Sequence, residues 1–129
     1  MIVVDSGVVI DALLGLDAND SLRIRLAGEE WHAPQLLDVE VVSIARGLVI
    51  GRRISAPRGV DLLNDFDDLR IARWPFTSAA RLRALELRVT LSAYDAAYVT
   101  LAEGLACPLV TRDARLSRST GHGATIELI

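Results

Sequence analysis

The stretch Ile2-Val3-Val4-Asp5-Ser6-Gly7 begins with an unbroken apolar run and ends on an acid, a hydroxyl residue and a glycine. Consecutive β-branched residues without polar alternation predict a strand that is buried on both faces, as in a parallel sheet. A second run of this kind, Leu109-Val110-Thr111, is followed two residues later by Asp113. Asp5 and Asp113 are therefore predicted just beyond the carboxyl ends of two buried strands.

Strand and helix patterns alternate along the whole chain outward from these two runs. Further strands are predicted at residues 31–33, 71–74 and 124–129. Helices are predicted at residues 8–14, 22–28, 34–49, 55–69, 77–89 and 92–106, with a short one around Leu116. Capping residues for the helix at 22–28 are supplied by Asn19-Asp20-Ser21. This alternation predicts an α/β fold, a three-layer α/β/α domain over residues 1–129 with a mostly parallel central sheet. In such sheets the functional crevice lies beyond the carboxyl ends of the strands, near a topological switch point.

Composition limits the kind of protein this chain can be. Its 129 residues are 51% hydrophobic, which suits one well-buried core. No apolar run approaches the roughly 18–20 residues that span a bilayer, and residues 2–4 are too short for a secretory signal. Cys107 has no partner for an internal disulfide and is interpreted as a small core residue. We expect a cytoplasmic protein that does not associate with membranes.

Charge is unevenly distributed along the sequence. The net charge of −3 argues against a general polyanion binder. Residues 41–60 nevertheless contain no acid and four arginines, a stretch that could bind a phosphate backbone or an acidic partner. The chain contains no lysine, which excludes a Walker-type phosphate lysine, a Schiff-base lysine and a lysine general base.

Two further acids lie on the inward side of predicted helices. Glu40 is three residues after Leu37 and four before Ile44, so it shares their apolar stripe at about 100° per residue. Asp95 is followed on its own helix face by small and apolar residues that would let the helix approach the sheet closely. These are Val99, Ala102 and Ala106.

Each acid also has an explanation that involves no ligand. Asp5 and Asp113 could simply cap the helices that follow them, and Asp95 could form a capping box with Ser92. Glu40 could lie at the edge of its stripe and extend into solvent.

If the acids instead converge, four hard oxygen donors without cysteine or histidine at ligand spacing favour Mg²⁺ or Mn²⁺ over zinc. His32, in a strand, and His122, in a turn, look like poor ligands. Ser6 and Thr111 lie beside the acids and could support them.

Four segments in order resemble PIN-domain ribonucleases, and most closely the VapC-type toxins of type II toxin–antitoxin pairs. The segments are Ile2-Val3-Val4-Asp5-Ser6, His32-Ala33-Pro34-Gln35-Leu36 leading to Glu40, Tyr94-Asp95-Ala96-Ala97-Tyr98-Val99, and Leu109-Val110-Thr111-Arg112-Asp113-Ala114-Arg115-Leu116. The resemblance implies that Asp5, Glu40, Asp95 and Asp113 form an acidic site for Mg²⁺ or Mn²⁺. It further implies RNA as substrate, a VapB-type antitoxin as inhibitor, and homodimers and larger toxin–antitoxin assemblies. Gly7 and Thr90 depart from the family pattern, which often has a hydroxyl residue and an asparagine there.

The chemistry expected from these residues is metal-assisted hydrolysis of a phosphodiester bond. Asp5, Asp95 and Asp113 would hold the metal directly or through water, and Glu40 would complete the shell or help to remove a proton from water. Arg112 and Arg115 flank Asp113 and could contact RNA phosphates.

Three other functions compete with this prediction. A metal-dependent phosphatase or a receiver-type domain also places aspartates at strand ends, but a receiver needs a lysine. A haloacid-dehalogenase-like enzyme would have a second aspartate where Gly7 stands. A catalytically weak or silent PIN-like module, which only binds RNA or a partner protein, remains the alternative from another class.

Overall fold

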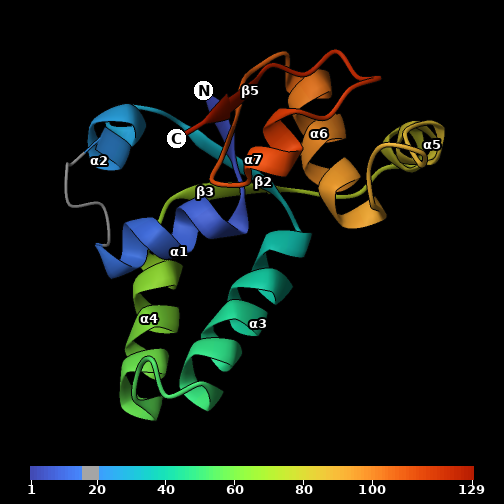
Figure 1. The fold of residues 1–129 in the computed structure, drawn as a ribbon. Helices are drawn as coiled ribbons and strands as arrows, with labels where there is room; N and C mark the ends of the chain where they lie inside the picture. The colour runs from blue at the N-terminus through green and yellow to red at the C-terminus, as the bar shows by residue number, and fades with distance from the viewer. Residues whose placement is uncertain (16–20) are drawn as a thin grey trace.

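A computed structural model describes residues 1–15 and 21–129 and contains a five-stranded sheet (Figure 1). The strands are β1 (Ile2–Val4), β2 (Trp31–Pro34), β3 (Ile71–Trp74), β4 (Leu109–Thr111) and β5 (Ile126–Leu128), in the spatial order β3-β2-β1-β4-β5. Every pairing among these strands is parallel, which confirms the predicted α/β class.

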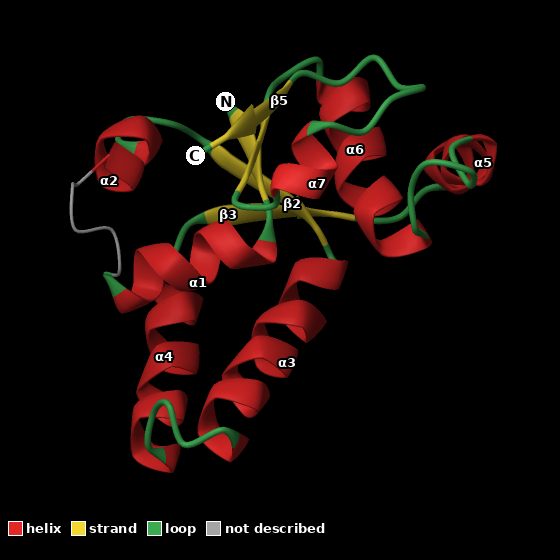
Figure 2. Cartoon of the chain, viewed as in Figure 1, coloured by secondary structure: helices red, strands yellow, loops and turns green. Residues whose placement is uncertain are grey.

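Helices cover the strands, as Figure 2 shows in red. They are α1 (Ser6–Leu14), α2 (Ser21–Leu26), α3 (Leu36–Ile50), α4 (Ala56–Asp68), α5 (Ser78–Glu86), α6 (Ala93–Leu105) and α7 (Ala114–Ser117). The predicted elements are thus all present, and the main differences lie at their ends. Asn19 and Asp20, predicted as capping residues, lie outside the described residues.

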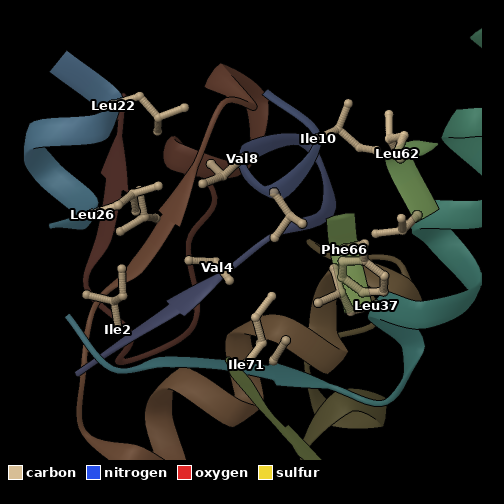
Figure 3. Packing of buried hydrophobic residues seen from close by; sticks show 14 of the residues in the cluster. Ile2, Val4, Val8, Ile10, Leu22, Leu26, Leu37, Leu62, Phe66 and Ile71 are labelled. Atoms are coloured by element: carbon tan, nitrogen blue, oxygen red, sulfur yellow. The ribbon is translucent and has the colours of Figure 1, made fainter. Parts of the chain in front are cut away.

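Alternation along β1 divides the interior into two hydrophobic clusters. Ile2 and Val4 join a cluster with residues of α1, α2, α3 and α4 (Figure 3). Val3 points the other way and packs with residues of α5, α6 and α7. All three side chains are 0% exposed. A strand buried on both faces needs a helical layer on each side, so the three-layer prediction is confirmed.

Helices α3 and α4 form a hairpin that extends away from the sheet (Figure 1). Close contact between them depends on Gly59, where an added Cβ would lie 2.9 Å from Cγ2 of Val49. Leu37, Val41 and Ala45 form the buried stripe of α3, and Ile44, which was predicted on the stripe of Leu37, is only partly buried at its edge.

Two predicted boundaries were wrong. Pro34 was expected in the first turn of a helix, but it is the last residue of β2, opposite Trp74, and α3 begins at Leu36. The next N–H, that of Gln35, donates to the Trp74 carbonyl at 3.0 Å and closes the ladder beyond the proline. Val89 was expected in the fifth long helix, but α5 ends at Glu86 and Val89 is exposed.

The order of the strands places a switch point between β1 and β4. The chain proceeds from β1 to β2 on one side and reaches β4 on the other side of β1. Val4 pairs with Val110, so the residues after both strands meet at the same edge of the sheet. Among the described residues, no helix combines the length and apolarity needed to cross a membrane.

Candidate active site

Asp5 links the end of β1 to the end of β4. One oxygen, Oδ1, accepts a hydrogen bond from the N–H of Val8 at 2.8 Å and caps α1. The other, Oδ2, accepts from the hydroxyl of Thr111, a residue that is 0% exposed. The same Thr111 oxygen accepts from the N–H of Asp113 at 2.9 Å. A buried threonine therefore fixes two acids at the switch point.

Asp113 caps α7 as the sequence suggested. Its Oδ1 accepts from the N–H groups of Arg115 at 2.8 Å and Leu116 at 3.2 Å. Its Oδ2 remains outside the cap and faces the guanidinium of Arg115 at 3.0 Å. Capping occupies one oxygen of the carboxylate and leaves the other available for another partner.

Glu40 enters from α3 and is held by Tyr98 of α6. The Tyr98 hydroxyl donates to Oε1 of Glu40 at 2.6 Å, across 58 positions of sequence. Glu40 is partly buried and Tyr98 is buried. Burial, together with the bond to Glu40, holds the pKa of Tyr98 well above its usual range. The phenol therefore remains protonated and continues to donate to Glu40 at neutral pH.

Asp95 lies in the first turn of α6. Its N–H donates to the hydroxyl of Ser92 at 3.2 Å, which is one half of the predicted capping box. Its own carboxylate points elsewhere: Oδ2 accepts from Nη2 of Arg115 at 2.8 Å. The buried Val99 and Ala102 follow on α6, which contacts β1 and β2 as expected. Ala106, predicted on the same face, is instead the exposed C-cap of α6, because the helix ends at Leu105.

The charges of these acids act on one another. Burial raises the pKa of Asp5, and the nearby Asp113 carboxylate raises it further. Hydrogen bonds from Thr111 and Val8 lower this pKa, but they do not outweigh the effect of burial. Burial also raises the pKa of Glu40, as do the charges of Asp5 and Asp95, while the bond from Tyr98 lowers it.

Asp113 shifts in the opposite direction. Its slight burial would raise the pKa, but the N–H groups of Leu116 and Arg115 and the Arg115 guanidinium lower it overall. A raised pKa beside a lowered one is typical of functional sites, where like charges are held together.

The remaining predicted residues occupy different places around the acids. Ser6 lies near Tyr98 and slightly lowers the pKa of that phenol against the larger effects of burial and Glu40. Arg115 reaches Asp95 and Asp113, whereas Arg112 pairs with Asp11 through Nε at 2.7 Å.

The two family departures also differ in position. A Cβ at Gly7 would lie 3.5 Å from Oδ1 of Asp5, so this glycine is beside the site. Thr90 instead donates to the Thr120 carbonyl at 3.0 Å, in the loop before α6. The histidines contact other residues: Trp74 donates to His32, and Ser119 contacts His122.

Tyr98 is the site residue whose role the sequence interpretation did not identify. Its signal was present, because a tyrosine on the buried face of a helix must find a partner for its hydroxyl. The sequence could not name Glu40 as that partner, since the two lie on different helices.

Comparison with known proteins agrees with this architecture. A family model described as the PIN domain matches residues 2–121. The chain belongs to the PIN-domain family. Within this family, Ribonuclease VapC12 of Mycobacterium tuberculosis is 42% identical over 129 residues, which cover 100% of this chain and 99% of that protein. This PIN domain is therefore of the VapC type.

Solved structures share the same fold at lower identity. VapBC2 from Rickettsia felis, in a crystal structure bound to a DNA fragment from its promoter, aligns with a TM-score of 0.72 at 15% identity, covering 99% of this chain and 98% of that chain. Mycobacterium tuberculosis VapC20, described as a sarcin-ricin loop cleaving toxin, aligns with a TM-score of 0.67 at 16% identity, covering 91% and 93%. At these identities the likeness concerns the fold of this PIN domain.

The donor chemistry of this PIN domain suits a hard divalent cation. As the side chains stand, no three His, Cys, Asp or Glu residues in the described part of the chain could together hold one metal ion. Mg²⁺ does not require three, because it retains several waters and commonly uses one or two carboxylates. Partly buried acids with raised pKa values and few compensating cations fit such an ion.

Proposed function

We propose that this PIN domain is a Mg²⁺- or Mn²⁺-dependent endoribonuclease that acts in the cytoplasm as the toxin of a toxin–antitoxin pair. The observation that carries the proposal is the gathering of Asp5, Glu40, Asp95 and Asp113 around one switch point. Shared hydrogen bonds and mutual charge effects connect these acids, which ordinary caps would not require. The 42% identity to Ribonuclease VapC12 supports RNA as the substrate.

Of Asp5, Asp95 and Asp113, one or two would hold the ion directly, and the rest would hold it through its bound waters. When bound, the ion would offset charge developing on the phosphate and acidify a nearby water. Thr111 positions Asp5 and the backbone of Asp113 for this purpose, and it is buried, so the geometry is set before any substrate arrives.

Glu40 is the residue best placed to move a proton. Its raised pKa, caused by burial and by the nearby Asp5 and Asp95, makes it a stronger base than an ordinary carboxylate. Tyr98 occupies Oε1 and therefore fixes the carboxylate, leaving Oε2 to accept a proton from an attacking water.

The partners of this PIN domain are proposed by analogy with its structural neighbours. Crystal structures of VapBC from Salmonella typhimurium and from Rickettsia felis describe related folds in toxin–antitoxin pairs. We propose a VapB-type antitoxin as inhibitor, a homodimer, and a larger assembly of the two proteins. The exposed arginines of the α3–α4 hairpin, Arg46, Arg52 and Arg53, would bind RNA backbone or an acidic patch of a partner.

A cleavage assay on total cellular RNA tests the activity. Wild type should cut RNA with Mg²⁺ and lose activity in EDTA, and Asp5→Asn should lose activity with Mg²⁺. Asp38→Asn is the matched control, because Asp38 is an exposed acid of α3 paired with Arg73 at 3.2 Å. Mapping the cleaved ends against Asp5→Asn would identify the substrate. Cleavage that persists in both EDTA and Asp5→Asn would refute the proposal, and RNA binding without cleavage would favour the silent module.

A further inference from the structure

Arg115 connects two of the acids from different elements. Its Nη2 donates to Oδ2 of Asp95 on α6 at 2.8 Å and to Oδ2 of Asp113 at 3.0 Å. Its backbone N–H also donates to Oδ1 of Asp113, so the start of α7 orients the side chain toward both acids. One guanidinium nitrogen thus lies where two carboxylates converge.

The ion pairs of Arg115 with Asp95 and Asp113 form at the surface, so separating their charges costs little free energy. The Arg115 side chain is 63% exposed, while those of Asp95 and Asp113 are 22% and 41% exposed. Exposed ion pairs contribute little stability, because water solvates the separated charges well. The same Oδ2 atoms cannot also serve a divalent ion while Nη2 lies against them, since the two cations repel and need the same lone pairs.

We propose that Arg115 is an internal counter-ion that is exchanged for the metal. Without metal, its guanidinium holds Asp95 and Asp113 together against their mutual repulsion. Metal binding displaces it, and the released guanidinium then lies beside the acids, free to hold an RNA phosphate through paired N–H donors. Arg115 is thereby a positioning residue in one state and a substrate contact in the other. This inference rests on the proposed metal dependence of the nuclease.

The neighbouring arginines differ from Arg115 in this respect. Arg112 pairs with Asp11 at 2.7 Å and reaches the carbonyl of Ile129, away from Asp95 and Asp113. Arg118 follows the last residue of α7 as its C-cap and is exposed, and no ion pair connects it to the acids among the described contacts. Arg118→Gln therefore removes the same charge at the end of α7 without removing the bridge.

Metal affinity measures the exchange directly. Arg115→Gln should bind Mn²⁺ about two- to five-fold more tightly than Arg118→Gln, the range expected for loss of a competing surface ion pair. Arg115→Lys should fall between Arg115→Gln and wild type, because a lysine retains the charge but lacks the planar fork. Isothermal titration calorimetry of the full chain with Mn²⁺ gives the dissociation constant of each variant and does not depend on RNA cleavage.

A structural readout accompanies the titration. In wild type, the Nε–H signal of Arg115 in a ¹⁵N–¹H spectrum should shift as Mg²⁺ is added, and that of Arg118 should stay in place. The Arg115 signal is assigned by its loss in Arg115→Gln.

Equal Mn²⁺ affinities in Arg115→Gln and Arg118→Gln, or an Arg115 signal unmoved by saturating Mg²⁺, would overturn the exchange while leaving the nuclease proposal intact. Failure of the nuclease proposal is seen separately, as RNA cleavage that survives EDTA and Asp5→Asn. Absence of Mn²⁺ binding in wild type and both glutamine variants would overturn the exchange as well.

Discussion

Removal of the Tyr98 hydroxyl should destabilise the fold and raise the pKa of the candidate base Glu40. In Tyr98→Phe, Oε1 of Glu40 loses a donor at 2.6 Å while the buried ring is kept. A hydrogen bond to a charged group contributes about 1.5–3 kcal/mol to stability. Glu40 is only partly buried, so water can replace part of that bond, and we expect a net loss of about 1–2 kcal/mol.

This loss corresponds to a measurable change in melting temperature. At ~2.1 cal/mol/K per residue, 129 residues give an unfolding entropy of about 0.27 kcal/mol/K. The expected decrease is therefore about 4–7 °C by calorimetry in EDTA. The pKa of Glu40 should also rise further, because the bond from Tyr98 lowers it in wild type. The acidic limb of the cleavage rate should then shift to higher pH.

Tyr94→Phe provides the matched control. Tyr94 lies on the same helix, one turn earlier, and is 66% exposed. Its hydroxyl is expected to contribute less than about 0.5 kcal/mol, as is typical of surface substitutions. A double-mutant cycle with Glu40→Gln isolates the pair. If Tyr98→Phe melts within 1 °C of Tyr94→Phe, or the cycle gives no coupling, the assignment of Tyr98 as the residue that fixes Glu40 is wrong.

Three further substitutions test the neighbourhood of Asp5. The pKa of Asp5 is raised in the folded protein, so its charged carboxylate destabilises the fold once the pH is above the ordinary value of 3.8. Asp5→Asn should therefore raise the melting temperature in EDTA at pH 7. This increase should disappear below pH 3.8, where the carboxyl group is protonated in both states. Gly7→Ala should stabilise the fold by about 0.5–1 kcal/mol in thermal denaturation, because alanine favours a helix more than glycine does. Its Cβ would cause no clash, since it would lie at an ordinary 3.5 Å from Oδ1 of Asp5. Thr111→Val should lower the free energy of unfolding by about 1–3 kcal/mol in urea denaturation. The carboxylate of Asp5 loses a hydrogen-bond donor, and the N–H of Asp113 loses its acceptor.

The sequence predicted the placement of Asp5 and Asp113 because parallel strands impose it. Buried strands must lie side by side, and their carboxyl ends must then share an edge of the sheet. Helical periodicity likewise predicted that Glu40 lies near the inward face of its helix, where the structure finds it partly buried. These predictions depend on backbone geometry, which short sequence patterns determine well.

Side-chain partners across elements were beyond the reach of the sequence. Tyr98 and Glu40 meet across 58 residues, and Arg115 reaches Asp95 across 20. Such pairs depend on where two helices lie on the sheet and on the rotamers that fit there, and neither follows from local spacing. Pro34 was misplaced for a related reason: its suitability for a first helical turn was outweighed by the pairing of β2 with β3.

The structure also shows that Asp5 and Asp113 can cap a helix and serve the candidate site at the same time. A carboxylate has two oxygens, and in both Asp5 and Asp113 Oδ1 caps a helix while Oδ2 faces another group of the site. A cap fixes the direction of the second oxygen, so it prepares the acid for a ligand. Asparagine caps a helix as well as aspartate does. Stability changes in Asp→Asn variants therefore report the removed charge and the lost bond at the second oxygen, while the cap itself is tested only by Asp→Ala.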